Sequence, residues 1–298
     1  MSRGVVFALT AYLLWGVFPL YFKQVQSVAP LEVLANRMVW SLVFVAGLLT
    51  ILRGTQWLRD LLRNRPPIGW FALSALAVSL NWLIYIWAVN TGHIVDASLG
   101  YFINPLLNVL IGALFLHERL RPAHWVAVLL AALAVAWLTW SAGQLPWIGL
   151  TLAISFAAYG LLRKRAPLGA IEGLAVETAL LAPAAIAYLA WLAFHRESAL
   201  LEALSDGRPA LVVSLLLAGP ITAVPLLFFA AGVRRIPFAT LGILQYVGPS
   251  LQLLIGVRLY GEPFEADKLI AYGAIWLALA IFSIDGLMQW RSSRSTPP

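Results

Sequence analysis

The stretches YFINPLLNVLIGALFLHE (residues 101–118) and QYVGPSLQLLIGVRLYGE (residues 245–262) decide the fold, because they align with each other at an offset of 144 residues. The identical pairs are Pro105 with Pro249, Leu107 with Leu251, Leu110 with Leu254, Ile111 with Ile255, Gly112 with Gly256 and Glu118 with Glu262. Matches of leucine are common in an apolar chain, whereas a proline, a glycine and a glutamate in one register are not. The chain therefore contains an internal repeat.

Around these stretches the chain is strongly apolar. Of its 298 residues, 61% are hydrophobic and 11% are charged, and the mean hydropathy is +0.86. A soluble domain is about a quarter charged and has too little surface to hide so many apolar side chains. The composition excludes a cytosolic enzyme, a nucleic-acid binder and a disordered scaffold. It predicts an all-α polytopic membrane protein.

Ten apolar stretches have about the length needed to cross roughly 30 Å of hydrocarbon as helices. They cover residues 4–22, 33–52, 68–89, 97–116, 125–140, 145–162, 173–194, 210–232, 238–257 and 269–290. The first stretch is longer than the apolar core of a signal peptide, and no cleavage site follows it closely, so we expect it to be retained. The remaining loops are too short to hold a soluble domain.

The basic residues predict the orientation. Fourteen of the 20 lysines and arginines fall on the side that holds the N-terminus, and cytoplasmic loops are the basic ones. Both termini are therefore expected in the cytoplasm, and the net charge of +7 needs no nucleic-acid partner. Since each half holds five helices, residues 4–140 and 145–290 form inverted repeats, followed by a cytoplasmic tail at 291–298. Inverted repeats are common in secondary transporters, with the substrate site near the midplane.

Polar side chains recur on one face of the two repeated helices. One face of the first helix carries Tyr101, Asn104 and Asn108. In the second helix, Gln245 aligns with Tyr101 and Gln252 aligns with Asn108. Such a stripe either lines a cavity or joins helices through amide hydrogen bonds, and both interpretations stay open. Deep tryptophans likewise serve either an aromatic substrate or core packing. The candidate cavity residues are Trp15, Asn81, Trp82, Tyr85, Tyr101, Asn104, Asn108, Tyr159, Gln245, Tyr246 and Gln252.

Prolines fall inside several predicted helices, at Pro19, Pro105, Pro183, Pro220, Pro225 and Pro249, and Pro105, Pro225 and Pro249 are the candidate kinks. A proline there removes one backbone hydrogen bond and bends the axis. A kink exposes carbonyl groups to a cavity and lets one half rock against the other. A kink that serves packing alone is the alternative.

Three ionisable residues lie within the predicted spans: Arg37, Glu177 and Asp285. Arg37 and Glu177 are near opposite ends of their helices, so we expect no ion pair between them. Arg37 is expected to reach outward to the membrane surface and Asp285 to be solvated. Glu177, near a helix N-terminus, is the candidate for proton coupling, because a partly desolvated carboxylate can titrate near neutral pH.

Glu118 and Glu262 end the two repeated helices, and we expect each to order the turn that follows. The sequence has no cysteine, no H-E-x-x-H spacing, no G-x-S-x-G and no P-loop. We therefore expect no enzyme activity, no metal and no cofactor.

Five runs resemble RarD-type permeases of the EamA family, in the drug/metabolite transporter superfamily. They are AYLLWGVFPLYFK (11–23), NWLIYIWAVN (81–90), ASLGYFINPLLNVLIGALFLHERL (97–120), SFAAYGLLRK (155–164) and LGILQYVGPSLQLLIGVRLYGE (241–262). The resemblance covers the chain from about Gly4 to Trp290. It implies two five-helix repeats, a bacterial inner-membrane location and a central cavity. It also implies movement of small metabolites or drugs.

These observations together predict a permease or exporter that moves a small organic solute by alternating access, with or without proton coupling, as a monomer or a homodimer. The uncharged lining suits a neutral or amphipathic solute better than a simple ion. A passive channel is the first alternative, although no ring of like charges appears at depth. A membrane sensor or scaffold ranks last, because the short loops offer no docking domain.

Overall fold

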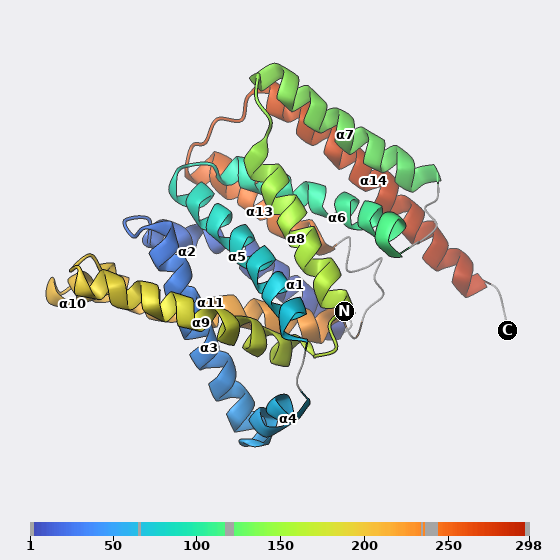
Figure 1. Ribbon diagram of the computed structural model, residues 1–298. Coiled ribbons are helices and arrows are strands. Elements are labelled where there is room, and N and C mark those ends of the chain that lie inside the picture. Colours follow the sequence, from blue (N-terminus) through green and yellow to red (C-terminus); the bar gives the residue numbers. More distant parts are fainter. Residues whose placement is uncertain (1–2, 65–66, 117–121, 234, 236–243, 296–298) are drawn as a thin grey trace.

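The computed structural model describes residues 3–64, 67–116, 122–233, 235 and 244–295 (Figure 1). These residues contain helices and no strand. The helices are α1 (Arg3–Gly16), α2 (Phe18–Gln24), α3 (Pro30–Arg53), α4 (Gln56–Asn64), α5 (Ile68–Asn90), α6 (Ile94–Leu116), α7 (Pro122–Ala142), α8 (Trp147–Arg165), α9 (Ala170–Phe194), α10 (Ala199–Ser205), α11 (Pro209–Val233), α13 (Val247–Leu254), the π-helix η1 (Ile255–Leu259) and α14 (Ala266–Ser295). The all-α expectation is confirmed for this part of the chain.

Seven helical segments among the described residues are long and apolar enough to cross a membrane. They are Arg3–Gln24, Pro30–Arg53, Ile68–Asn90, Pro122–Ala142, Ile171–Phe194, Pro209–Phe229 and Ala266–Asp285. Three shorter apolar helices, Ile94–Leu107, Trp147–Arg163 and Val247–Leu259, coincide with three further predicted spans. The expectation of several membrane-crossing helices is confirmed, whereas the count of ten remains a prediction.

The first span is interrupted where its sequence requires it. Helix α1 ends at Gly16, and α2 begins at Phe18 with Pro19 in its first turn, where a missing N–H interrupts no helical bond. At Gly16 an added Cβ would lie 2.7 Å from the Leu251 side chain, so this glycine lets α1 approach α13 closely. Beside it, Gln252 Nε2 donates to the Trp15 carbonyl at 3.0 Å. Helix contacts through small residues and buried amides replace the hydrophobic drive that lipid cannot supply.

The helices of the two halves pack in corresponding pairs. In chain order α1 corresponds to α8, α3 to α9, α5 to α11, α6 to α13 and α7 to α14. Helix α1 packs against α11 and α13, and α8 packs against the counterparts of both, α5 and α6. Helix α3 packs against α11, and α9 packs against α5. Three further pairs, α3 with α9, α6 with α13 and α7 with α14, each join two corresponding helices, and α3 also packs against α5.

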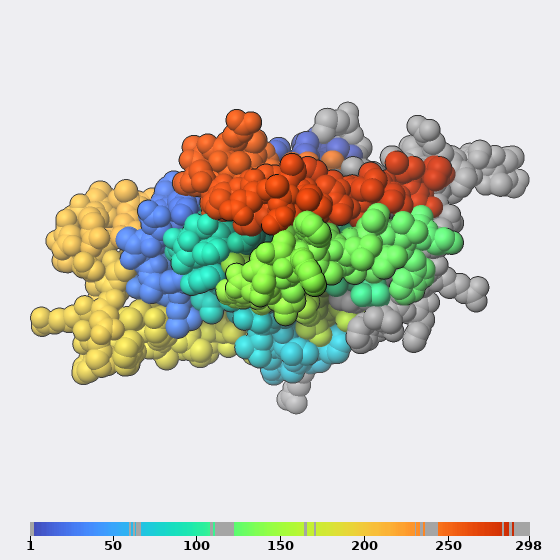
Figure 2. Space-filling model, turned by 90° about the horizontal axis from the view of Figure 1, so that it is seen from above, coloured from blue at the N-terminus to red at the C-terminus, as the bar shows by residue number. Residues whose placement is uncertain are grey.

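Helices α7 and α14 form an edge of the molecule, where they lie side by side (Figures 1 and 2). Leucines on their outer faces, including Leu129, Leu133 and Leu277, are more than half exposed. A face of this kind suits lipid rather than water. The described ends of α1 and α14 lie toward the same side of the molecule (Figure 1).

Candidate functional site

Arg37 is the eighth residue of α3 and is almost completely buried, with 3% of its surface exposed. Its Nε donates to Thr222 Oγ1 of α11 at 2.5 Å. Its guanidinium carbon lies 4.1 Å from the centre of the Trp82 ring in α5, and Phe22 and Phe18 of α2 lie 5.4 and 5.7 Å away. We call these five residues the arginine cage. The expectation that Arg37 reaches outward is wrong, because three aromatic rings and a hydroxyl hold it inside.

Two polar groups at the arginine cage lack a partner. Arg37 Nη1 and the Tyr85 hydroxyl are buried without a hydrogen bond in the part of the chain that the structure describes. No carboxylate among those residues forms an ion pair with Arg37. Buried charges are normally paired, because an isolated charge in a low-dielectric interior is costly. The cage therefore has donors available for a ligand.

Beside the cage, hydrogen bonds join α5 to α6 and α8. The Tyr85 and Tyr101 ring centres are 5.7 Å apart, and the Tyr85 ring centre is also 5.7 Å from that of Phe22 in the cage. The Tyr101 hydroxyl donates to Asn81 Oδ1 at 3.1 Å. Asn81 Nδ2 in turn reaches the Leu152 carbonyl at 2.9 Å and Ser155 Oγ at 3.1 Å. Four predicted cavity residues, Asn81, Trp82, Tyr85 and Tyr101, thus lie together around the cage.

A second buried charge, Glu177 of α9, lies in a separate cluster. Its carboxylate accepts from Ser74 Oγ of α5 and, at 3.4 Å, from the Tyr159 hydroxyl of α8. Arg163 Nη1 of α8 is 3.6 Å from Glu177 Oε1. We call Ser74, Tyr159, Arg163 and Glu177 the glutamate cluster. It joins three helices around a carboxylate that is 1% exposed.

Helix α9 leaves room for this ion pair through Gly173. A Cβ at that position would overlap the Arg163 guanidinium. Arg163 Nη2 also donates to the Gly169 carbonyl at 3.0 Å, just before α9 begins. Glu177 itself is the eighth residue of α9, beyond the first turn in which a helix dipole acts. Arg163, not the dipole, is therefore the main charge that faces Glu177.

The two buried charges occupy corresponding places. Arg37 and Glu177 are each the eighth residue of their helices, and Glu32 and Glu172 are each the third. Arg37 contacts α11 and α2, and α2 continues the span that α1 begins. Glu177 contacts α5 and α8, the counterparts of α11 and α1. Each charge has its own partners, in keeping with the expectation that they do not pair with each other.

Most of the other predicted cavity residues bond to neighbouring helices. Asn104 Nδ2 donates to the Ala153 carbonyl at 3.1 Å, and Gln245 Nε2 donates to Asn104 Oδ1 at 3.4 Å. Tyr246 stacks on Phe102 with ring centres 6.4 Å apart, and Trp15 lies 5.5 Å from Phe229. These contacts, like that of Gln252 described above, fit the interpretation as helix adhesion. The Asn108 side chain lies outside the described residues.

The three predicted kink prolines lie in different helical positions. Pro105 is inside α6, and Pro225 is inside α11. Pro249 is the third residue of α13, where its missing N–H interrupts no bond within that helix. In α6 and α11, therefore, a proline interrupts the backbone hydrogen bonds of the helix.

Glu262 has a role that differs from the expected one. It does not order its own turn; its two carboxylate oxygens accept from the backbone N–H groups of Ile94 and Val95, each at 2.8 Å. These are the first two residues of α6, whose N–H groups have no partner within the helix. Glu262 therefore caps a helix of the other half. Its counterpart Glu118 lies outside the described residues.

Asp285 also differs from expectation. Its Oδ2 is 3.2 Å from His124 Nε2, and both side chains are less than one-fifth exposed. The contact links α14 to α7. The expectation of a solvated carboxylate is wrong, because the two edge helices enclose it.

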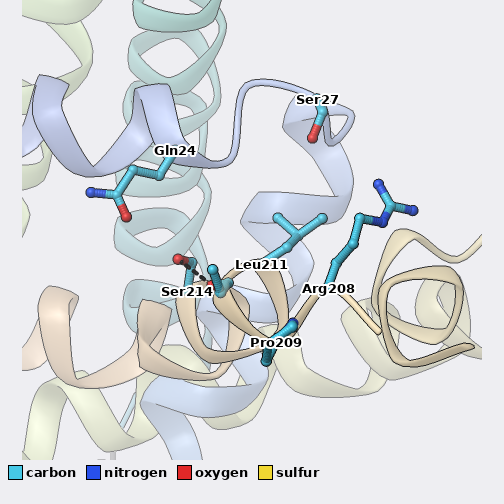
Figure 3. Close-up of a pocket in the computed structure, with 7 residues that line it drawn as sticks. Gln24, Ser27, Arg208, Pro209, Leu211 and Ser214 are labelled. Atoms are coloured by element: carbon cyan, nitrogen blue, oxygen red, sulfur yellow. Dashed lines mark hydrogen bonds between the residues drawn. The ribbon is translucent and has the colours of Figure 1, made fainter. Parts of the chain in front are cut away.

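An open hollow of about 560 Å³ lies near the arginine cage (Figure 3). It lies between the end of α2 with its following turn and the start of α11, and is lined by Gln24, Ser27, Arg208, Pro209, Ala210, Leu211 and Ser214. The Ser214 carbonyl accepts from the Tyr21 hydroxyl at 2.9 Å, and the Tyr21 ring packs edge-on against Phe22 of the cage, with ring centres 4.9 Å apart. A single tyrosine thus connects the hollow to the cage.

The sequence contained a signal for both charged sites that the offset of 144 does not reveal. EVLANR at 32–37 matches EGLAVE at 172–177 at an offset of 140, and the charge is reversed at the last position. The sequence has no such signal for Thr222, Ser74 or the α2 pair Phe18 and Phe22. Their roles depend on contacts between helices that are distant in the sequence.

Comparison with known proteins identifies the family. The model of the EamA-like transporter family matches residues 2–140. An uncharacterized transporter of Pseudomonas aeruginosa is 47% identical over 100% of this chain and 97% of its own length. Protein RarD of Escherichia coli is 43% identical over 97% of this chain and 96% of its own length. The chain belongs to the EamA family, in its RarD-type group.

The family makes this chain a multi-pass membrane transporter. A crystal structure with 20% sequence identity superimposes with a TM-score of 0.60 over 96% of this chain and 99% of that one. At that identity the likeness bears on the fold alone. The identities to the RarD proteins and related transporters confirm the RarD-type resemblance read from the sequence.

The cap on α6 predicts a stability effect. Glu262→Ala leaves two buried N–H groups without an acceptor, and we expect it to destabilise the protein by about 2 kcal/mol. Thermal unfolding of the detergent-solubilised protein, followed by circular dichroism, measures this as a lower melting temperature. Glu265→Ala is the matched control, because it removes an exposed carboxylate of the same loop. Equal melting temperatures for the two variants would contradict the cap.

Proposed function

We propose that this EamA-family protein is a secondary transporter of a small organic solute that works by alternating access between two inverted five-helix halves. The observation that carries the proposal is the correspondence of the packing pairs, in which α1, α3 and α6 contact the second half as α8, α9 and α13 contact the first. Such a pseudo-symmetric arrangement allows two related conformations, each opening the site to one side.

The substrate site in this proposal is the region of the arginine cage. It is formed by α2, α3, α5 and α11, so both halves contribute to it. Asn81, Trp82 and Tyr85 are buried there, which fits a state in which the centre is closed. The hollow of Figure 3 lies between the end of α2 and the start of α11, two helices that also contribute residues to the cage.

The glutamate cluster serves as the opposite gate in the same proposal. It links α5, α8 and α9 through a buried carboxylate, at the position that corresponds to Arg37. Protonation of Glu177 would weaken its attraction to Arg163 and release that link. Proton movement would in this way be coupled to opening.

The membrane and orientation complete the proposal. The relatives are bacterial transporters, and we place the protein in the inner membrane with both termini in the cytoplasm. The excess of basic residues in the loops on the side of the N-terminus supports this orientation. The described ends of α1 and α14, which lie toward the same side of the molecule in Figure 1, also support it. The oligomeric state is proposed as a monomer or homodimer.

Transport itself is tested with purified protein in liposomes. Vesicles are loaded with a defined mixture of amino acids and small aromatic metabolites, and mass spectrometry follows which compounds leave. We expect flux of at least one compound to saturate and to accelerate when the same compound is present outside, because a carrier exchanges one bound solute at a time. Flux that rises linearly with concentration and shows no such acceleration would identify a passive channel instead.

Proton coupling predicts a specific change in Glu177→Gln. Glutamine keeps hydrogen-bonding capacity toward Ser74 and Tyr159 but cannot exchange a proton, so we expect solute exchange to persist and its pH dependence to disappear. Glu172→Gln is the matched control on the same helix, where the carboxylate pairs with Arg53 at 2.5 Å. If Glu177→Gln keeps the pH dependence of the unmodified protein, Glu177 is a structural carboxylate.

The orientation is testable because the natural chain has no cysteine. Single substitutions Gln56→Cys in α4 and Ser205→Cys in α10 place thiols at exposed positions. We expect a membrane-impermeant maleimide to label Ser205→Cys in intact spheroplasts, and Gln56→Cys only after permeabilisation. The reverse labelling pattern would contradict the proposed orientation and place both termini on the outer side of the membrane.

A further inference from the structure

The unpaired guanidinium of the arginine cage restricts the chemistry of a ligand. Arginine carries five N–H donors, and the only hydrogen bond of the Arg37 side chain within the described residues uses Nε. The buried Nη1 has no partner there. The side chain thus presents donors in a planar fork, the geometry that matches a carboxylate.

The aromatic rings around Arg37 only partly compensate its burial. A cation–π contact offsets only part of the free-energy cost of burying an ion. Charged side chains at membrane depth are rare, and those present usually serve function. The cage therefore holds a positive charge that an anionic ligand would neutralise.

Other groups at the cage fit the rest of such a ligand. The Tyr85 hydroxyl is a second unpartnered donor. Trp82, Phe18 and Phe22 offer aromatic faces for an apolar body. Glu32, the acidic residue nearest to Arg37 in the sequence, already has a partner, because its carboxylate accepts from the Ala199 N–H at 2.9 Å.

The arginine that lines the hollow is less suited to this task. Arg208 is 3.0 Å from both Glu202 and Asp206, so carboxylates of its own loop already neutralise it.

We infer that the substrate is an organic anion, a small carboxylate with an apolar or aromatic body, and that Arg37 is its anchoring residue. This inference rests on the proposed transport function and names its substrate class. It replaces the neutral solute expected from the uncharged stripes, because Arg37 lies at the centre of the cage and does not reach outward.

The test compares carboxylates with their uncharged amides. Acetate, phenylacetate and indole-3-acetate, and the corresponding amides, are added at equal ionic strength to the full-length protein in detergent, and scanning calorimetry records the melting temperature. We expect at least one carboxylate to raise it more than its amide does. In Arg37→Gln the difference should disappear, or need at least a tenfold higher concentration, and Arg37→Lys should keep part of it.

Arg258→Gln is the matched control, because it removes an exposed arginine from the second half. We expect it to respond like the unmodified protein. The inference is overturned if no carboxylate of the three stabilises the protein more than its amide, or if the difference persists in Arg37→Gln.

The same compounds in the liposome exchange assay separate the two proposals. If carboxylates bind through Arg37 but no solute exchanges, the anion site stands and the transport function fails. If neutral solutes exchange and Arg37→Gln leaves that exchange unchanged, the transport function stands and the anion site fails.

Discussion

A polar group within the hydrocarbon has no water to bond, and this constraint governs how the side chains of this protein are used. Asn81, Asn104 and Gln252 each donate to a backbone carbonyl of a neighbouring helix. The amide stripes thereby become contacts between helices, and glycines such as Gly16 bring the backbones near enough. Among the buried groups that these contacts leave without a partner in the described part of the chain, Arg37 Nη1 and the Tyr85 hydroxyl lie at the arginine cage.

The two buried charges show how corresponding helices can differ. Arg37 and Glu177 occupy the same position in α3 and α9, yet one is held by aromatic rings and a threonine, and the other by an arginine, a serine and a tyrosine. A symmetric frame with opposite charges at equivalent places gives the two ends of the molecule different chemistry. In the proposed mechanism one end attracts an anion, and the other responds to protons.

The sequence predicted the helical class, the apolar spans and the family, because hydropathy and the repeated proline, glycine and glutamate are local features. It failed where the partner is distant. Arg37 lies 185 residues from Thr222, and Glu262 lies 168 residues from Ile94. Depth along a helix suggested that Arg37 reaches outward, but depth says nothing about which helices surround a side chain. The offset of 140 in α3 and α9 was the one readable sign of the charged pair.

The Glu262 carboxylate that closes the start of α6 also bears on how the chain is divided. The loop after η1 belongs to the second repeat, yet it completes a helix of the first. Helix α1 likewise meets α13, and α8 meets α6. Helices from both halves of the sequence are therefore packed together, and a chain synthesised only as far as α6 lacks the carboxylate that accepts from the first N–H groups of that helix.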